Sequence, residues 1–519
     1  MVRLLSGDFL GMEGRIVEVQ VDVSSKGSPA FNIVGLPGKS IRESRERVRA
    51  AIRNSGLKFP FDQRILVNLA PAAEQKDGAG FDLAVTLGIL LASRQLKLPE
   101  ETCESGGLLG GIGFVGELGL NGDIRPVPGV LLTACALKDG GVSRLVVSPG
   151  NALETALVEG LTVFAAEDLH QAIASLQGNF SPFVPPRWGE AGSASSGRPG
   201  GRAGTIDFAE VRGQEATKRG LLVAAGGEHN ALLVGPPGVG KTMLARRLPG
   251  ILPPMVFAEA MEVTRIRSVQ GCEMPNQLAQ ARPFRAPHHT ISYTGLVGGG
   301  SRLRPGEVTR AHRGVLFLDE LPEFNRRALE ALREPMEEGR ITIGRGSGSV
   351  TFPSRFLLLA AMNPCACGYL GHEKRACTCS SFEIRAYRQR LSGPLLDRID
   401  IFIEVRSVDT DDLLGGKPGR QGTGTAALRD RVLRARALQE RRWREPLANA
   451  HVPLDRLLEE GQVHPAALQY LRDHAERLGI SARGFTRSLR VARTIADLEE
   501  SWQVETRHLA EALHYRERL

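Results

Sequence analysis

One eight-residue segment, which reads GPPGVGKT, constrains the fold of this chain more than any other stretch. An apolar run at residues 231–234 precedes it, and a helix-compatible run at residues 242–248 follows it. This order of strand, loop and helix is the setting in which glycine N–H groups and a helix N-terminus surround phosphates. A Gly-rich turn of another kind would rarely carry all eight positions, so we predict a nucleotide-binding α/β core. The predicted cofactor-binding residues of the loop are Gly235, Pro236, Pro237, Gly238, Val239, Gly240, Lys241 and Thr242.

Two further apolar runs are predicted to end beside this loop. Residues 315–318 lead into Asp319 and Glu320, and residues 356–362 lead into Asn363. Such runs are typical of buried parallel strands. Lys241 can reach the β- and γ-phosphates of ATP, while Asp319 and the Thr242 hydroxyl are expected to hold Mg²⁺. We expect Glu320 to polarise the attacking water, and Asn363 to sense the γ-phosphate or that water.

Four of the seven cysteines lie between residues 365 and 379, and they are Cys365, Cys367, Cys377 and Cys379. Four thiolates suit a tetrahedral, structural Zn²⁺ site, which is our prediction for them. Pairs of the form C-x-C are less diagnostic than C-x-x-C, and His372 could replace one sulfur. A redox pair and inert thiols are the alternatives. The odd and low cysteine count argues against a disulfide framework and favours a reducing compartment.

The length of 519 residues is too great for a single core and predicts several domains. Short apolar runs alternate with helical stretches in residues 1–180, which predicts an α/β or α+β domain. Residues 181–206 are rich in Pro, Gly and Ser and are predicted to be a flexible linker. The nucleotide-binding core is expected at residues 207–414, with the cysteine cluster inside it. A hinge-like segment at residues 415–424 then precedes a helical domain at residues 425–519. Two apolar stripes at helical spacing predict that domain: Leu428, Val432, Ala435 and Leu438, and Leu489, Ala492, Ile495 and Ala496.

Local patterns predict two helices, a hairpin and the role of a histidine pair. Residues 40–54 are predicted to form a helix that buries Ile41, Val48 and Ile52, and residues 324–338 are predicted to form one helix on the sheet. Residues 339–353 read as a β-hairpin with Arg340 and Arg345 on or near its tip. The pair His288 and His289 is predicted to have a packing or loop role, because adjacent histidines point apart on a strand and no carboxylate is expected near them.

The charge balance favours an anionic partner only weakly. The formal net charge is +8, and a basic balance of this kind is a modest indication of nucleic acid. The sequence has no apolar run of 18 residues and no signal-peptide pattern at its start, so we expect a cytoplasmic protein with no membrane contact.

The segment from Gln75 to Leu91 resembles the one around the nucleophile in the proteolytic domain of Lon-type proteases. No serine stands between these two residues. The resemblance therefore implies a Lon-protease-like fold, of the ribosomal S5 domain 2 type, without the peptidase chemistry.

The loop GPPGVGKT, the strand VLFLDE, Asn363 and the segment GPLLDRID at residues 393–400 together resemble AAA+ ATPases of the magnesium-chelatase-like branch. Two more segments, FNIVGLPGKS at residues 31–40 and SARGFTRSLRVARTIADL at residues 481–498, make the resemblance specific to the YifB/ComM family. It implies a hexameric ring in which each ATP site is completed by a neighbour, and a helical lid that closes over ATP. Asn363 then matches sensor 1, and Arg398 matches the arginine finger given to the neighbouring subunit. Arg483 matches sensor 2, a role for which Arg487 and Arg490 are rivals.

The same resemblance implies the function. It implies an ATPase, with ATP, Mg²⁺ and structural Zn²⁺ as cofactors, that acts on DNA by branch migration during recombination of incoming DNA. Arg345 on the hairpin and Arg302 in the Gly-rich loop at residues 295–302 are the candidate contacts to DNA phosphates. The alternatives are a chelatase motor that inserts a metal or remodels a protein partner, and a non-enzymatic or proteolytic module. The segment Gly213 to Glu215 also resembles the part of related ATPases that covers the adenine.

Overall fold

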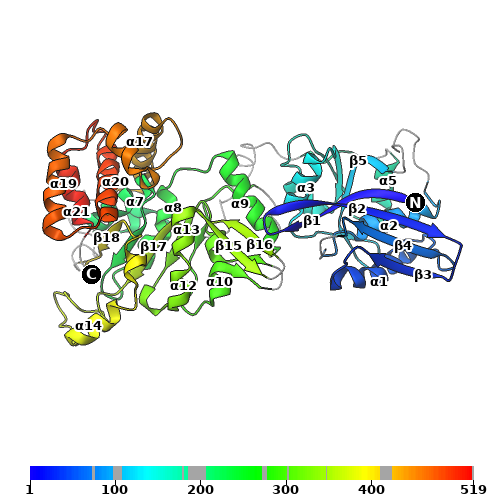
Figure 1. The fold of residues 1–519 in the computed structure, drawn as a ribbon, viewed down its shortest axis with the longest axis horizontal. Helices are drawn as coiled ribbons and strands as arrows, with labels where there is room; N and C mark the ends of the chain where they lie inside the picture. The colour runs from blue at the N-terminus through cyan, green and yellow to red at the C-terminus, as the bar shows by residue number, and fades with distance from the viewer. Residues whose placement is uncertain are drawn as a thin grey trace. The chain divides into compact units, whose positions relative to one another are not determined.

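The computed structural model of the chain describes residues 1–72, 76, 78–96, 108–177, 181–184, 206–271, 278–300, 303–345, 348–408 and 423–516. Two compact units emerge from the contacts within it (Figure 1). The first joins residues 1–198 to residues 257–279 and 344–351. The second joins residues 199–256, 280–343 and 352–519. None of the described helices is long and apolar enough to cross a membrane.

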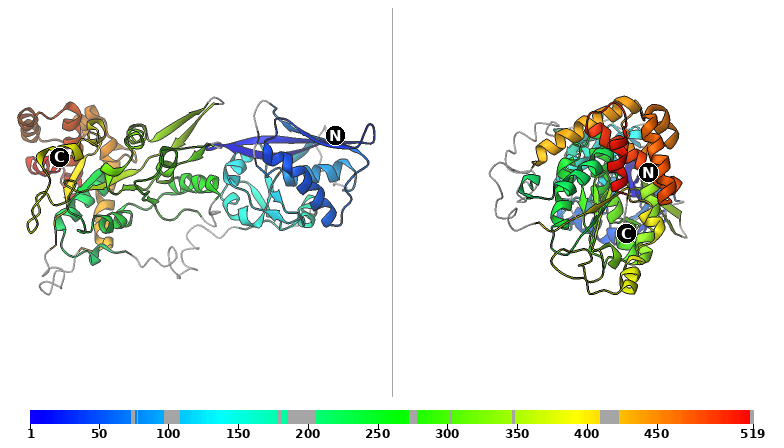
Figure 2. Two further views of the ribbon diagram at one scale, coloured as in Figure 1. Left: turned by 90° about the horizontal axis from the view of Figure 1, so that it is seen from below. Right: turned by 90° about the vertical axis from the view of Figure 1, so that its left-hand side faces the viewer.

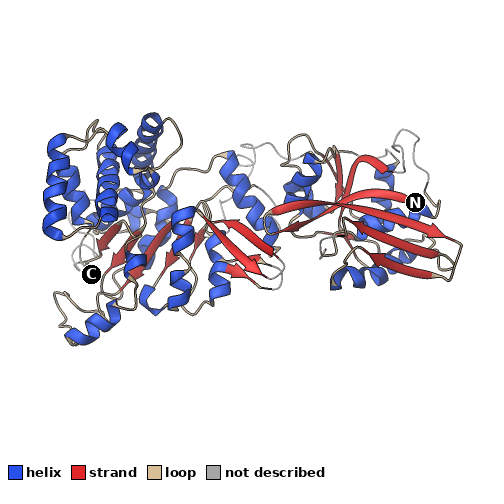
Figure 3. Cartoon of the chain, in the orientation of Figure 1, coloured by secondary structure: helices blue, strands red, loops and turns tan. Residues whose placement is uncertain are grey.

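The first unit is built on a mixed sheet with helices on both faces (Figure 3). Its strands are, in sheet order, β3 (Ala30–Val34), β4 (Arg64–Ala70), β2 (Glu13–Ser24), β1 (Val2–Leu10), β5 (Leu108–Val115), β8 (Arg144–Val147) and β9 (Thr162–Ala165). Strand β2 is antiparallel to β1 and β4, and the other pairs are parallel. Side chains alternate between the two faces: Leu4 packs with one hydrophobic cluster and Leu5 with the other.

Each face of this sheet has its own helices. The cluster around Leu4 contains α1 (Lys39–Asn54), α2 (Asp82–Ala92) and α5 (Leu169–Leu176), and the cluster around Leu5 contains α3 (Val130–Asp139) and α4 (Pro149–Thr155). A short ribbon of β6 (Glu117–Leu118) and β7 (Ile124–Arg125) lies apart from the sheet. The predicted helix at residues 40–54 is confirmed as α1, with Ile41, Val48 and Ile52 buried.

Helix α9 (Phe257–Gln270) belongs to the first unit although the sequence places it after the phosphate loop. It packs on α3, and the backbone N–H of Gly129, at the start of α3, donates to the carbonyl of Ser268 at 2.8 Å. Met261 packs against the same hydrophobic cluster. A segment expected in the nucleotide-binding core therefore contributes to the core of the first unit.

The second unit is built on a five-stranded parallel sheet. Its strands are, in sheet order, β11 (Phe284–Arg285), β14 (Val315–Leu318), β17 (Leu357–Met362), β10 (Ala231–Val234) and β18 (Ile401–Glu404). Every residue of β14 is buried, and its side chains alternate between two hydrophobic clusters. This arrangement confirms the predicted α/β core and explains the continuous apolar runs, because both faces of the sheet are covered.

One face carries η2 (Phe208–Glu210), α7 (Glu215–Gly227) and α8 (Lys241–Ile251). The other face carries α10 (Tyr293–Val297), α11 (Glu307–Arg310), η3 (Leu321–Glu323), α12 (Arg326–Glu330), α13 (Arg333–Glu338), α14 (Ser381–Arg388) and α15 (Gly393–Leu396). Two short ribbons follow in the sequence: β12 (Gly298–Gly299) with β13 (Arg304–Pro305), and the hairpin β15 (Arg340–Arg345) with β16 (Gly348–Pro353). Residues 344–351 of this hairpin group with the first unit and the rest with the second.

The helical C-terminal region forms one bundle, drawn orange to red in Figure 2. It contains α17 (Thr425–Trp443), η4 (Asn449–His451), α18 (Leu454–Glu460), α19 (Pro465–Leu478), α20 (Ala482–Leu498) and α21 (Thr506–His514). Its hydrophobic side chains join the cluster under α7 and α8, so the bundle extends one layer of the sheet's core. Both predicted stripes face inward, with only Leu438 partly exposed.

Two local predictions need correction. Residues 324–338 do not form one helix: α12 ends at Glu330 and α13 starts at Arg333. The physical reason is Pro335, which has no N–H to donate to the carbonyl of Ala331. In the hairpin, Arg340 begins β15 and therefore lies at the base and not at the tip. At the base it pairs with Glu338 at 3.0 Å.

Candidate nucleotide site

The phosphate loop joins the carboxyl end of β10 to the start of α8. Strand β10 lies between β17 and β18, so the segments after all three strands meet at the same edge of the sheet. Gly238 and Gly240 adopt left-handed φ angles of 79° and 90°, which favour glycine. A Cβ on Gly235 would lie 2.2 Å from the carbonyl oxygen of Val405, so a larger residue has no room there.

Lys241 is the centre of a small hydrogen-bond network. Its Nζ donates to the carbonyls of Gly235 at 2.6 Å and Pro236 at 2.9 Å, and to Oδ1 of Asn363 at 3.0 Å. Burial lowers the pKa of Lys241, whereas the carboxylates of Asp319 and Glu320 act in the opposite direction. The predicted phosphate lysine and the predicted sensor are therefore in direct contact.

Thr242 and Asp319 also meet, as the motif requires. The Thr242 hydroxyl donates to Oδ2 of Asp319 at 2.6 Å. A hydroxyl and a carboxylate side by side at the phosphate loop are oxygen ligands of the kind that Mg²⁺ takes together with nucleotide phosphates. The two side chains fit the metal role predicted for them.

Glu320 has a partner that the sequence reasoning missed. Nδ1 of His289 lies 3.1 Å from Oε2 of Glu320, and Glu320 has a left-handed φ of 53°. The expectation that no carboxylate is near His289 is therefore wrong. The reason lies in the sheet order: β11 and β14 are neighbours with Arg285 opposite Leu316, so residues four positions further on meet again. The sequence does show that His289 is a polar residue just beyond an apolar segment. It does not show that this segment pairs with β14, and that pairing is what brings His289 to Glu320.

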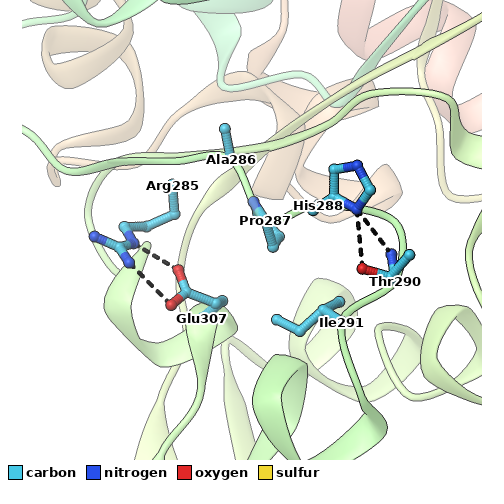
Figure 4. Close-up of a pocket in the computed structure, with 7 residues that line it drawn as sticks. All are labelled: Arg285, Ala286, Pro287, His288, Thr290, Ile291 and Glu307. Atoms are coloured by element: carbon cyan, nitrogen blue, oxygen red, sulfur yellow. Dashed lines mark hydrogen bonds and ion pairs between the residues drawn. The ribbon is translucent and has the colours of Figure 1, made fainter.

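The segment that carries His289 borders a pocket of about 350 Å³ (Figure 4). On one side the Arg285 guanidinium makes two contacts with the Glu307 carboxylate, at 2.6 and 2.9 Å. On the other side, Nδ1 of His288 lies 2.9 Å from the Thr290 hydroxyl. These contacts fix both ends of the turn between β11 and α10, and so they brace His289 opposite Glu320.

The segment predicted to cover the adenine also lies near the loop. Gln214 has a left-handed φ of 60°, and its Nε2 donates to the carbonyl of Arg406 at 2.5 Å. Arg406 follows Val405, whose carbonyl oxygen lies against Gly235. Gln214 is thereby held on the β18 side of the phosphate loop.

The predicted arginine finger lies at the amino ends of the strands, opposite the end that carries the phosphate loop. The carbonyl of Arg398 accepts from Nδ2 of Asn230, which immediately precedes β10. Arg398 is 6% exposed, and its guanidinium binds Glu337 and the carbonyl of Pro394. One strand length thus separates Arg398 from the phosphate loop of its own chain.

Two of the three sensor 2 candidates are held near that same end of the strands. Nε of Arg487 lies 3.4 Å from Oδ1 of Asp400, which precedes β18, and Nε of Arg490 donates to the carbonyl of Val452 at 2.8 Å. Arg483 is exposed at the start of α20. The structure brings none of Arg483, Arg487 and Arg490 into a described contact with the phosphate loop, and the choice among them stays a prediction.

The four clustered cysteines converge on one point, with their sulfur atoms all within 4.8 Å of one another. The Sγ atom of Cys365 lies 3.4 Å from that of Cys367 and 3.6 Å from that of Cys377. All four are free thiols. A tetrahedral site with Zn–S bonds of about 2.3 Å places its sulfurs about 3.8 Å apart, so the donor set fits Zn²⁺. His372 is not part of this group: its Nδ1 accepts from the backbone N–H groups of Lys374 and Arg375, and its Nε2 lies 3.4 Å from the Ser407 hydroxyl.

The two predicted DNA contacts, Arg302 and the side chain of Arg345, lie outside the described residues.

Three family models match the chain. The model of magnesium chelatase, subunit ChlI, matches residues 207–413, the model of subunit ChlI of Mg-chelatase matches residues 17–151, and the model of the ChlI C-terminal region matches residues 422–516. Together they follow the N-terminal domain, the parallel-sheet core and the helical region.

Individual relatives match over almost the whole length. The chain is 40% identical to the competence protein ComM of Haemophilus influenzae, over 98% of this chain and 96% of the relative. It is also 40% identical to the protein YifB of Escherichia coli, over 98% of this chain and 95% of the relative. The magnesium-chelatase 67 kDa subunit of Heliobacterium mobile is 28% identical over 39% of this chain and 35% of that subunit.

Proposed function

Because the chain belongs to the YifB/ComM family of proteins with magnesium-chelatase-like ATPase domains, we propose that it is an ATP-driven hexameric motor that acts on DNA. Its work would be branch migration during recombination of incoming DNA, which places it in the cytoplasm. The observation that carries the ATPase is the convergence of Lys241, Thr242, Asp319 and Asn363 at one edge of the parallel sheet. The observation that favours DNA is the full-length likeness to a protein named for competence.

The residues of the site divide the work of ATP hydrolysis. Lys241 binds the β- and γ-phosphates, in place of the carbonyls that it now contacts. Thr242 and Asp319 hold Mg²⁺, which neutralises phosphate charge when bound. Glu320 takes the proton of the attacking water, and Asn363 orients that water or the γ-phosphate.

A ring supplies the part that one chain lacks. Arg398 lies at the edge of the sheet opposite its own phosphate loop, which supports a role in the site of a neighbouring subunit. To act there it would exchange Glu337 for the γ-phosphate of the neighbour's ATP. We assign sensor 2 to Arg483, with Arg487 and Arg490 as rivals.

The remaining assignments follow from composition and donor chemistry. The net charge of +8 suits a DNA partner, and Arg345 and Arg302 are the proposed phosphate contacts. The cysteine cluster would hold structural Zn²⁺ through Cys365, Cys367, Cys377 and Cys379. For the N-terminal domain we propose a Lon-like fold that does not act as a peptidase.

The second candidate function is a chelatase-type motor that drives metal insertion or remodels a protein partner. The match to the 67 kDa chelatase subunit favours it. That match covers little more than a third of either chain, whereas the competence protein matches throughout. We therefore rank DNA first.

The test is ATP turnover by the full chain with and without single-stranded, duplex and four-way-junction DNA. A DNA motor should hydrolyse ATP several-fold faster with at least one of these DNAs, and it should separate or migrate the junction only when ATP is present. Lys241→Ala is the control without turnover. ATP hydrolysis that no DNA stimulates, with no junction movement, would reject the DNA function and leave the chelatase-type reading.

A further inference from the structure

The cysteine loop, defined as residues 365–379, touches the phosphate loop. Its first turn, residues 365–368, is closed by the N–H of Gly368, which donates to the carbonyl of Cys365 at 3.0 Å. A Cβ built on Gly368 would lie 2.8 Å from Cδ of Pro237 and 3.8 Å from Cγ of Asn363. Even one methyl group therefore has no room between this turn and the phosphate loop.

Two more contacts tie the cysteine loop and the helix after it to the same site. Nε2 of His372 lies 3.4 Å from the hydroxyl of Ser407, on the segment that follows β18. The cysteine loop leads into α14, which begins one residue after Ser380 and is capped by that residue. The hydroxyl of Tyr387 on α14 accepts a hydrogen bond from the backbone N–H of Asn363. Asn363 is thus held from both ends of the cysteine loop.

Residues 365–379, all of which the structure describes, form neither helix nor strand. A segment without regular structure has few backbone hydrogen bonds to keep its shape, so a metal bound by its four thiolates would be its main cross-link. Cys365 is fully buried and lies two residues beyond Asn363. The cross-link therefore acts directly beside the residue that accepts from Lys241.

We infer that the first turn of the cysteine loop is a wall of the phosphate site, and that metal binding by the four thiolates holds this wall where ATP binding needs it. The inference rests on the proposed zinc and ATP sites and goes beyond them, because it makes ATP affinity depend on the metal. In the metal-free chain the turn is released, Pro237 and Asn363 lose their support, and the phosphate loop is no longer preorganised for the nucleotide.

A matched pair of glycine variants of the full chain tests the wall. Gly368 and Gly371 have similar left-handed φ angles, 84° and 78°, but a Cβ on Gly371 would meet nothing within 4 Å. Both alanine variants therefore carry the same backbone cost, and only Gly368→Ala collides with Pro237. We expect Gly368→Ala to raise the Kd for a fluorescent ATP analogue about tenfold. Gly371→Ala should change this Kd less than twofold. Equal effects of the two variants would overturn the wall.

Removal and return of the metal tests the dependence. Zinc is stripped from the wild-type full chain with a zinc-selective chelator, Mg²⁺ is kept in excess, and metal content and the Kd for the ATP analogue are measured together. We expect about one Zn²⁺ per chain at the start. The Kd for the ATP analogue should rise at least about tenfold after the zinc is removed and return to its first value when Zn²⁺ is added back. An unchanged Kd in verified zinc-free protein would overturn the inference but leave the zinc site intact. Protein that never contains zinc would instead reject the zinc site, and Lys241→Ala reports separately on the ATP site.

Discussion

At the scale of single residues, the ATP site separates binding from hydrolysis. Lys241 contacts the phosphate loop and Asn363, whereas Glu320 follows β14, which β17 separates from β10, and is more than half exposed. We predict that Lys241→Ala abolishes ATP binding, while Glu320→Gln binds ATP normally and hydrolyses it at least about 100-fold more slowly, as expected for loss of a general base. Equilibrium binding and phosphate release measure the two properties. Normal turnover by either variant would refute these roles.

His289 gives a second prediction at this scale. Its ring lies against the Glu320 carboxylate, which makes no hydrogen bond to another side chain in the described part of the chain. The backbone of Glu320 has a left-handed φ. His289→Ala should lower kcat about tenfold and leave the Kd for ATP within twofold, because a positioning residue acts on the water activator and not on the phosphates. His170→Ala is the control, since His170 is an exposed histidine on α5 of the first unit. A loss in ATP affinity equal to the loss in kcat would contradict the positioning role.

The two halves of this site differ in how far the sequence predicts them. Thr242 and Asp319 were paired correctly because the loop and the acidic strand end are both specific patterns. The contact between His289 and Glu320 could not be predicted, because it depends on β11 and β14 being neighbours in the sheet. Local patterns identify residue types, and strand order decides which of them meet.

At the scale of elements, the predictions held where hydrophobic spacing decides the structure. Helix α1 and the inward stripes of α17 and α20 follow from apolar positions three or four residues apart. The single helix predicted over residues 324–338 failed because the same spacing continues across Pro335, and the hydrophobic pattern does not register a missing N–H.

A buried carboxyl group where α4 meets α9 makes the stability of the first unit depend on pH. Glu154 on α4 is 1% exposed, and burial raises its pKa to about 7 although Ser268 of α9 and Asn151 act in the opposite direction. The folded chain then keeps a proton that the unfolded chain releases above about pH 4.5, so the free energy of unfolding should fall as pH rises from 4.5 to 7. Between pH 5.5 and 8 the loss from this group is on the order of 2 kcal/mol.

Glu154→Gln should remove this term, because an amide does not titrate. Calorimetric unfolding of the wild type and the variant at pH 5.5 and pH 8 gives the change in Tm with pH for each protein, and the two changes are then compared. We expect the wild type to lose several degrees more in Tm than the variant, since about 2 kcal/mol corresponds to roughly 4–8 °C for a unit of this size. The carboxyl of Asp82, whose pKa burial also raises to about 7, is present in both proteins and cancels. Parallel pH curves would show that Glu154 ionises without cost.

At the scale of the whole molecule, the order of the segments in the sequence is a poor guide to which unit they join. The nucleotide-binding core was expected at residues 207–414, yet α9 packs with α3 in the first unit. Nothing in the sequence of α9 signals this, because an apolar helix face has the same pattern whichever surface it covers. The family models, by contrast, follow the predicted order of an N-terminal domain, a parallel-sheet core and a helical C-terminal region.

The proposed ring supplies the last prediction. Arg398 is one strand length from its own phosphate loop and is bound to Glu337, so a role in hydrolysis requires a second subunit. Arg398→Ala should bind ATP nearly normally and hydrolyse it on the order of 10³-fold more slowly, the scale seen for arginine fingers in other NTPases. Arg398→Lys should recover little, because an ammonium lacks the planar fork of the guanidinium.

Mixing two inactive proteins makes this test specific for a shared site. In a ring of Arg398→Ala and Lys241→Ala subunits, some interfaces pair an intact Lys241 loop with an intact Arg398 from the neighbour. ATP hydrolysis should therefore reappear on mixing, in proportion to the number of such interfaces, although neither protein is active alone. Subunit exchange is verified by mass, and circular dichroism checks that Arg398→Ala is folded despite the loss of a buried side chain. Verified mixed rings that stay inactive, or Arg398→Ala turnover at the wild-type rate, would show that this arginine does not complete a neighbour's site.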